Sequence, residues 1–473
     1  MSMQKTYLFV SSDLFSWHHM ENIQWRVRPV LKHEKSPFFT EALISNTGRP
    51  WEVRYDNGYP NVIHDRENDI FRLYYSTFIT DEESRCRPLA ERPSAAYIPT
   101  SRRVVATCYA ESKDGIHWTK PSLGKVVWNG SSDNNILMAQ THGAGIFLDD
   151  QEPDPKKRYK MLTRIDLGSG HVMAVCYSED GLNFTDPIEI RGLGPQADTH
   201  NVVFRDRDSG RFVLITRIWK DGVRIAAKSV SDNFIDWSIP VEILRGFGPE
   251  WQVYSMPVFQ EADLYLGLPS MYREGDRTMP DFDKVDVSLA FSRDLDRFDF
   301  TAGGDPIIPR GEGSYPDGAF DAGCVYASAP IFTDDRILIY YVGGNGLHTG
   351  FREGSLALGY LERDKYAFLE PRDSSTSGIV VTRPFKMLGG EVRLLTEIED
   401  GGSIEYELYD PRTSTAVDGF TANDVTPITE SGWVSLAFNA DPSEYPVEPV
   451  SIRMTLRGAR VFGIQGDLWL RTR

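Results

Sequence analysis

A short polar turn followed by an aromatic residue recurs five times along this chain. Tyr109-Ala-Glu-Ser-Lys-Asp-Gly-Ile-His-Trp118 and Tyr177-Ser-Glu-Asp-Gly-Leu-Asn-Phe184 are the first two copies, and Lys228–Trp237, Ala290–Phe298 and Leu358–Phe368 follow. The copies carry the turn aspartates Asp114, Asp180, Asp232, Asp294 and Asp364, spaced 66, 52, 62 and 70 residues apart. Such self-similarity is typical of radial or stacked arrays, and each copy reads as strand, turn and strand. The repeat predicts an all-β fold, a five-bladed β-propeller.

A second series of five apolar hairpins alternates with the first. These predicted inner hairpins lie within residues 60–78, 145–163, 201–216, 254–268 and 325–341. Each blade is therefore expected to hold four antiparallel strands, with an inner hairpin followed by an outer one. Helical signals are poor, because few stretches keep an apolar helical stripe before Gly or Pro intervenes.

The 473 residues exceed what one hydrophobic core usually serves, so at least two domains are expected. We expect residues 1–40 to wrap the propeller or close a blade, and residues 41–372 to form the propeller itself. After a polar linker at 373–378, residues 379–473 show short alternating strands that predict a C-terminal β-sandwich. The sequence leaves its role open between sugar binding, a structural buttress and a dimer surface, so a homo-oligomer also stays open.

Composition excludes several function classes. With 51 basic and 68 acidic residues, the net charge of −17 opposes phosphate-rich partners and predicts no nucleic-acid binding. No stretch approaches the roughly 20 apolar residues of a membrane span, and Met1–Val10 lacks signal-peptide features. The prediction is a cytoplasmic protein without a membrane partner. Its four cysteines show no metal or redox spacing, and the chain has no nucleotide-binding glycine motif, so no cofactor is predicted.

Ionisable residues stand just before every predicted inner hairpin. In chain order these are Asp56 with Asn57, His142, Asp198 with His200, Glu250, and Asp317 with Asp321. Carboxylates gathered in one concave site repel, which holds one of them protonated. A glycosidase needs one protonated carboxyl group as the acid and one ionised carboxylate as the nucleophile or base. The sequence thus predicts Asp56, Asp198, Glu250 and Asp321 as catalytic, although each also fits a structural role in a turn or loop.

Other residues near these positions are candidates for substrate binding. Trp51 and Trp251 are expected to stack on a sugar ring. The further candidates are Asn57, His142, His200, Tyr254, Asp317 and His348. Three of them, His142, His200 and His348, have the residue type of metal ligands. Their spacing has no HxxxH or HxH pattern, so no metal is predicted.

Residues 50–372 resemble the five-bladed propeller glycosidases of glycoside hydrolase families 32, 43, 68 and 117. The resemblance is carried by Trp51-Glu-Val-Arg-Tyr-Asp-Asn-Gly-Tyr-Pro-Asn61, Asn201–Asp206 and Leu289–Asp294. The layout is most similar to family 32, in which a β-sandwich follows the propeller. The resemblance implies that Asp56 is the nucleophile, with a stabilising aspartate and an acid glutamate from later blades. The Trp-Met-Asn-Asp-Pro-Asn-Gly, Arg-Asp-Pro and Glu-Cys signatures of family 32 are absent, so the chain resembles an outlying branch.

The resulting hypothesis is an exo-acting glycoside hydrolase that releases a terminal sugar, with a furanoside as one option, from an oligosaccharide. Glu250 or Asp321 would be the acid, while Asp198 and His200 would hold ring hydroxyls. One alternative is a propeller glycoside phosphorylase, for which Arg54, Arg217, Arg352 and His348 would form the basic cluster. Another alternative is a non-catalytic carbohydrate-binding propeller.

Overall fold

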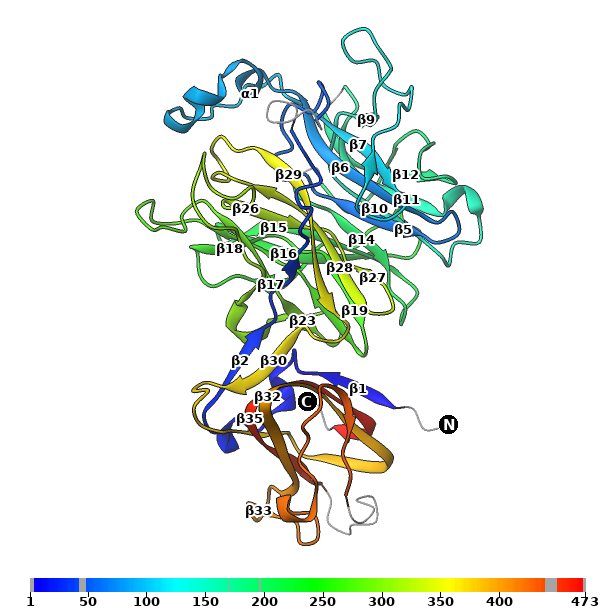
Figure 1. Cartoon of the computed structure of the whole chain (residues 1–473). Coiled ribbons are helices and arrows are strands. Elements are labelled where there is room, and N and C mark those ends of the chain that lie inside the picture. Colours follow the sequence, from blue (N-terminus) through cyan, green and yellow to red (C-terminus); the bar gives the residue numbers. More distant parts are fainter. Residues whose placement is uncertain (1–3, 42–47, 169, 195–196, 439–448, 471–473) are drawn as a thin grey trace.

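The computed structural model describes residues 4–41, 48–168, 170–194, 197–438 and 449–470. Strands dominate these residues and build two bodies, a β-propeller and a smaller strand-rich unit on which both ends of the chain lie (Figure 1). The α-helix is α1 (Glu82–Cys86), and short 3-10 turns occur at Ser12–Leu14, Trp17–His19, Leu89–Ser94, Pro155–Lys157, Thr301–Gly304 and Ala422–Asp424. In the described ranges, none of the helices has the length and apolar character that crossing a bilayer requires.

Four antiparallel sheets have the strand order of propeller blades. The first contains β5 (Asn61–Asp65), β6 (Ile70–Thr80), β7 (Val104–Ser112) and β8 (Trp118–Thr119), with β9 (Ile136–Ala139) also on β7. The second contains β10 (Thr141–Leu148), β11 (Tyr159–Asp166), β12 (His171–Ser178) and β13 (Ile188–Glu189). The third contains β14 (Val202–Arg205), β15 (Phe212–Lys220), β16 (Val223–Ser231) and β17 (Val241–Arg245). The fourth contains β19 (Val258–Glu261), β20 (Leu264–Gly267), β23 (Ala290–Ser292) and β24 (Asp299–Phe300). The all-β propeller arrangement predicted from the repeat is confirmed.

The remaining propeller strands belong to one ten-stranded sheet. It joins β18 (Trp251–Ser255), β21 (Ser270–Arg273), β22 (Val285–Ser288), β26 (Cys324–Ala327), β28 (Arg336–Gly344), β29 (Gly354–Glu362) and β3 (Leu31–Lys32), with β25 (Pro306–Ile308), β27 (Ile331–Phe332) and β4 (Phe39–Thr40) beside this path. The sequence predicted that Leu358–Phe368, from within β29 to the start of β30, forms the outer hairpin of the fifth blade. Instead, the N-terminal strands β3 and β4 pair with the outer edge of β29. The count of five blades stays a prediction.

The repeated turn has a local hydrogen-bonded explanation. Ser112 Oγ accepts from the Gly115 N–H, and Asp114 Oδ1 accepts from the N–H groups of Ile116 and His117. The second copy repeats these bonds through Ser178 and Asp180. In the third copy the acceptor is Asn233 and not the expected Asp232. Side-chain acceptors that satisfy turn N–H groups explain why Ser and Asp or Asn recur there.

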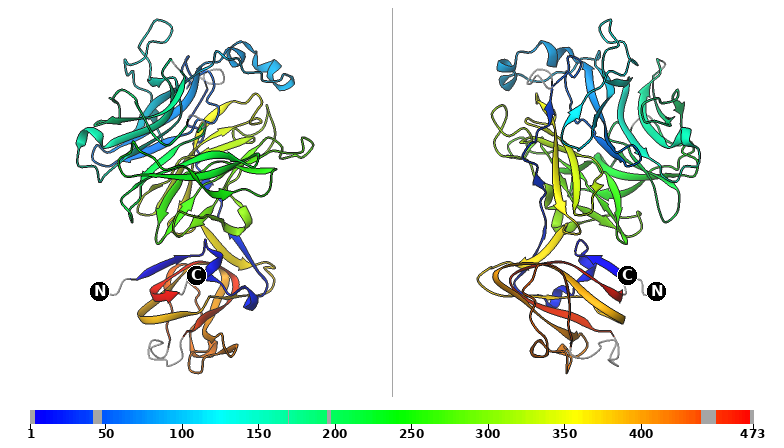
Figure 2. Two further views of the ribbon diagram at one scale, coloured as in Figure 1. Left: turned by 180° about the vertical axis from the view of Figure 1, so that it is seen from behind. Right: turned by 45° about the vertical axis from the view of Figure 1, so that its right-hand side comes forward.

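The second body is an eight-stranded sheet built from both ends of the chain. Its strands are β1 (Lys5–Leu8), β2 (Ile23–Val27), β30 (Ala367–Pro371), β31 (Gly378–Val381), β32 (Phe385–Asp410), β33 (Thr415–Ala416), β34 (Gly432–Ser435) and β35 (Ser451–Leu470). Residues expected to end the propeller thus form β30 of this sheet, which pairs with β2 and β35. Seen from behind and after a turn of 45°, this unit lies apart from the blades (Figure 2). The β-sandwich assignment and the domain boundaries stay predictions.

Candidate active site

The segment that enters the first blade is a strained turn. Asp56, Gly58 and Tyr59 all have left-handed backbones, with φ of 55°, 64° and 40°. A Cβ on Gly58 would lie 2.5 Å from Val342 Cγ2, so this position needs glycine both for its φ and for its space. Left-handed non-glycine residues are uncommon, and they cluster at functional sites where the surroundings hold them in place.

Two arginines hold the carboxylate of Asp56. Arg352 Nη2 donates to Asp56 Oδ1 at 2.8 Å, and Arg54 Nε donates to the same oxygen at 3.2 Å. Both arginine side chains are 1% exposed, whereas that of Asp56 is 24% exposed. Burial alone would raise the pKa of Asp56. The positive charges beside it, chiefly those of Arg352 and Arg54, together outweigh burial, so the pKa of Asp56 lies well below its usual value. Asp56 is thus an ionised carboxylate in a fixed position that solvent still reaches.

Asn57 and Tyr59 connect Asp56 to the entries of other blades. Arg352 Nη2 also donates to Asn57 Oδ1, and Asn57 Nδ2 donates to the hydroxyl of Tyr59 at 2.7 Å. The Tyr59 ring lies 5.6 Å from that of His142 and 5.5 Å from that of His200, between ring centroids. Residues at the starts of three different inner strands therefore meet around one tyrosine, with Tyr59 just before β5, His200 just before β14 and His142 as the second residue of β10.

Close backbone approach places His142 next to His200. Gly143 has φ of +63°, and a Cβ there would lie 1.7 Å from the carbonyl oxygen of Thr199. The Asn201 N–H donates to the Gly143 carbonyl at 3.0 Å. The chain at the start of the second blade therefore packs directly against the chain that leads into the third blade.

Tyr254, at the start of the fourth predicted inner hairpin, and His348, in the loop after β28, complete this group. The Tyr254 ring lies 4.7 Å from the His348 ring, between centroids, and the Arg217 guanidinium lies 4.8 Å from the centre of Tyr254. The Tyr326 hydroxyl and His348 Nδ1 are hydrogen-bonded at 2.7 Å. Arg217 Nη2 donates to Asp198 Oδ1 at 2.6 Å. The Arg224 guanidinium lies 5.8 Å from the centre of the Tyr254 ring. We name as the central cluster Arg54, Asp56, Asn57, Tyr59, His142, Asp198, His200, Arg217, Arg224, Tyr254, Tyr326, His348 and Arg352.

The three histidines of the central cluster are held uncharged. Burial lowers the pKa of His200 to about 3. Burial also lowers the pKa of His142 and, with Arg352 beside it, places the pKa of His348 well below the usual value. A neutral imidazole offers one donor and one acceptor, which suits contacts to hydroxyl groups. Among the residues that the structure describes, no three His, Cys, Asp or Glu side chains are grouped so as to hold a metal ion.

Seven of the predicted site residues belong to the central cluster: Asp56, Asn57, His142, Asp198, His200, Tyr254 and His348. The other predicted positions have different surroundings. Trp51 donates to Asn135 Oδ1 and packs edge-on against Trp128. The Trp251 ring is covered by the Arg273 guanidinium at 3.5 Å.

The remaining predicted acids lie outside the central cluster. Glu250 is exposed just before β18, and Asp317 is exposed in a turn. Asp321 is 1% exposed, accepts from Lys32 Nζ at 2.6 Å and from the Tyr341 hydroxyl at 3.0 Å. Its pairing with strand β3 favours the structural interpretation over a role as acid.

The sequence reasoning missed Tyr59, Tyr326 and Arg224. Tyr59 stands in the same polar run as Asp56 and could have been found there. Tyr326 lies inside the apolar strand β26 and resembles a core residue, and Arg224 belongs to β16, the third strand of its blade. The rule that examined only the residues before each inner strand could not find the last two.

Comparison with known proteins gives likenesses of structure alone. No protein-family model and no curated protein sequence matches this chain. Among solved structures, a glycosyl hydrolase from Bacteroides ovatus has a TM-score of 0.46 and 13% identity over 70% of this chain and 94% of its own. A structure from the GH130 family of mannoside phosphorylases, which contains glycoside hydrolases that target β-1,2 mannosidic linkages in Candida mannan, has a TM-score of 0.47 and 13% identity over 72% and 96%. An N-acetylgalactosamine deacetylase from F. plautii has a TM-score of 0.44 and 12% identity over 73% and 97%. At these values the likenesses carry no argument about substrate or reaction, and the specific resemblance to family 32 stays a prediction.

Proposed function

We propose that this protein is a carbohydrate-active enzyme that hydrolyses a glycosidic bond at the central cluster. The observation that carries the proposal is Asp56, an ionised carboxylate with a strained backbone, two guanidinium partners and access to solvent. A fixed carboxylate of this kind suits the nucleophile or base of glycoside hydrolysis. We assign that role to Asp56.

Asp198 is the second carboxyl group of the proposed reaction. Its side chain is 51% exposed, and Arg217 occupies one of its oxygens. It is the other carboxylate of the central cluster, whereas Glu250 and Asp321 lie outside it. We therefore propose Asp198 as the partner that exchanges a proton with the leaving oxygen. Asn57, His142, His348 and Tyr254 would hold sugar hydroxyls.

The finer parts of the hypothesis accompany this assignment. Exo-action on a terminal sugar, and a furanoside as one option, rest on the resemblance to propeller glycosidases. We further propose that β27, β28 and β29, with β3 and β4 at the outer edge, form the fifth blade, and that the eight-stranded unit is a β-sandwich.

The test is turnover by the purified full chain on aryl glycosides and short oligosaccharides, with and without inorganic phosphate. Asp56→Asn should lower kcat by about 10²–10⁴-fold, because the charge that attacks or activates water is lost. Asp317→Asn is the matched control, since it makes the same change at an exposed turn and should keep full activity. Near-normal turnover by folded Asp56→Asn would refute the assigned role.

Phosphorolysis is the second candidate, and the guanidinium groups of the central cluster favour it. Within the central cluster, four buried guanidinium nitrogens have no hydrogen-bond partner among the described residues: Arg54 Nη1, Arg217 Nε, Arg224 Nε and Arg352 Nε. Unused charged donors suit a phosphate oxygen. Turnover that requires phosphate and yields a sugar phosphate would select this reaction. Saturable sugar binding without cleavage, unchanged in Asp56→Asn, would select the non-catalytic alternative.

A further inference from the structure

A cavity formed by the inner strands of the propeller adjoins the central cluster at His200, which lines it. Its volume is about 390 Å³, which falls within the roughly 300–1,000 Å³ of ligand pockets. Residues of β5, β10, β14, β19 and β27 line it. We name it the distal pocket; the polar residues that line it include Asn61, Asp149, Asp150, Arg205, Arg207 and Gln260, together with His200 at its boundary with the central cluster.

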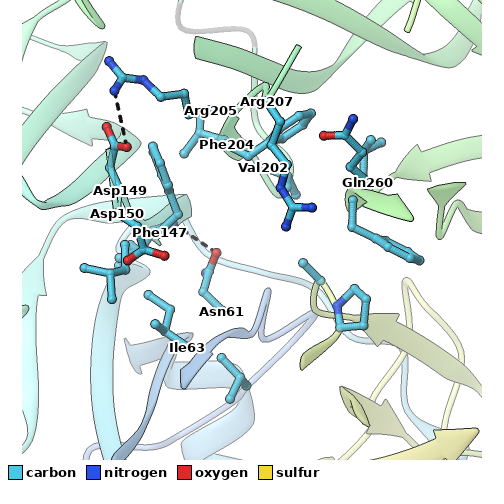
Figure 3. Close-up of a pocket in the computed structure, with 18 of the residues that line it drawn as sticks. Asn61, Ile63, Phe147, Asp149, Asp150, Val202, Phe204, Arg205, Arg207 and Gln260 are labelled. Atoms are coloured by element: carbon cyan, nitrogen blue, oxygen red, sulfur yellow. Dashed lines mark hydrogen bonds and ion pairs between the residues drawn. The ribbon is translucent and has the colours of Figure 1, made fainter. Parts of the chain in front are cut away.

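The walls of the distal pocket combine apolar surface with charges of both signs. Ile63, Phe147 and Phe204 contribute side chains to it. Asp149 and Asp150 lie on one side, and Arg207 and Gln260 lie across from them (Figure 3). A sugar ring presents C–H surface on its faces and hydroxyls around its edge, so apolar walls with polar groups on opposite sides match its shape and chemistry.

Three charged groups in the distal pocket keep unused hydrogen-bonding capacity. Asp150 and Arg207 are exposed, and neither makes a hydrogen bond or ion pair within the described part of the chain. Arg205 lies 3.7 Å from Asp149 Oδ1, yet its buried Nε has no hydrogen-bond partner among those same residues. Polar groups gathered in a concave surface without partners indicate a ligand that supplies both donors and acceptors.

The balance of charge selects the class of ligand. An anion would be attracted by Arg207 and repelled by Asp150, and a cation would meet the reverse. A neutral polyol satisfies both groups, because each hydroxyl both donates and accepts. We propose that the distal pocket is a non-catalytic binding site for a neutral sugar unit. This site stands apart from the proposed function, since it requires binding without bond cleavage.

A fully bonded amide separates the distal pocket from the central cluster. Asn61 Nδ2 donates to the carbonyls of Tyr59 and Ala144, while Asn61 Oδ1 accepts from the Ile146 N–H and lies 3.2 Å from His200 Nε2. The hydrogen-bonding capacity of the Asn61 side chain is thus fully used within the protein, and Asn61 forms a rigid part of the pocket floor. The sugar would therefore be held by the free groups on the walls, above all Asp150 and Arg207.

Ligand-observed NMR by saturation transfer on the full chain tests the proposal. The probes are glucose, galactose, mannose, fructose and arabinose, with glucuronate and glucosamine as charged comparators. The variants Asp150→Ala and Arg207→Ala should each weaken binding of a neutral sugar at least about tenfold, because each removes a charged hydrogen-bonding group. Ala329→Trp, which fills the pocket from its wall, should abolish it.

Two control variants separate this site from the central cluster. Arg211→Ala removes an exposed arginine that pairs with Asp232 outside the pocket, and it should leave binding unchanged. Asp56→Asn should also retain distal binding, whatever its effect on turnover. Binding that Asp150→Ala, Arg207→Ala and Ala329→Trp all leave unchanged, or that only Asp56→Asn removes, would overturn the inference while leaving the proposed function standing. Failure of every neutral sugar to bind at millimolar concentration would overturn it as well.

Discussion

Acidification from pH 7 to pH 5 is expected to destabilise the propeller through its buried histidines. His200 is 3% exposed, and burial lowers its pKa to about 3 from the usual 6.5. The unfolded chain therefore binds a proton below pH 6.5 that the folded protein takes up only near pH 3. Between these values the free energy of unfolding falls by about 1.4 kcal/mol for each pH unit.

The size of the effect follows from these two values. Stability from His200 is complete above pH 6.5 and declines as the pH falls, so about 2 kcal/mol should be lost by pH 5. His142 and His348 also have lowered pKa values, and they add to the loss. Asp56 titrates below this window, because its pKa is lowered from an already acidic value. Glu41 acts in the opposite sense: burial raises its pKa to about 8, so its protonation in the folded protein offsets part of the histidine loss as the pH falls. The comparison of His200→Gln with the parent isolates the histidine contribution.

Urea unfolding followed by tryptophan fluorescence at pH 7, 6 and 5 measures the effect. His200→Gln keeps a side-chain amide that can donate to Asn61 but does not titrate. The variant should lose about 2 kcal/mol less than the parent between pH 7 and pH 5. The control is His171→Gln, which changes an exposed histidine at the start of β12 and should keep the parent's pH dependence. An identical pH dependence in His200→Gln and the parent would refute the reasoning.

Two further predictions concern the strands that support the central cluster. Lys32→Met should lower the free energy of unfolding by about 3 kcal/mol, because it leaves the buried Asp321 carboxylate without its counter-charge. Lys32→Arg keeps a positive charge and should restore most of this free energy. A loss below about 1 kcal/mol for Lys32→Met in urea unfolding would contradict the prediction. Gly143→Ala should cost about 2–5 kcal/mol, because its Cβ would overlap the Thr199 carbonyl in a left-handed backbone. Gly124→Ala has a similar φ of +67° but open space and should cost about 1–2 kcal/mol in the same assay, so equal losses would exclude the clash as the cause.

The propeller arrangement was predictable because its signals are local. Ser112 and Asp114 bond to N–H groups two or three residues away, so the same short sequence recurs wherever this turn is needed. The entry residues Asp56, His142 and His200 were also predictable, because polar residues just before apolar strands stand out in the sequence.

The rest of the site depends on contacts that no local pattern records. Asp321 follows the same entry rule, but Lys32, 289 residues away, is its partner. Arg352 lies in the loop after β28 and reaches Asp56 across 296 residues. Of the two arginines that hold Asp56 ionised, Arg54 is a sequence neighbour, whereas Arg352 is brought there by a tertiary contact that the entry rule could not supply.

The N-terminal strands also govern when the fold can be completed. β1 pairs with β35, and the Tyr7 hydroxyl donates to the Leu468 carbonyl across 461 residues. β3 and β4 pair with β29. During synthesis these strands emerge well before their partners β29 and β35, so they stay unpaired while the chain between them is made. Unpaired strand edges expose a growing chain to misassembly. Completion of both bodies is therefore a late step in folding, because each needs strands from residues 5–40.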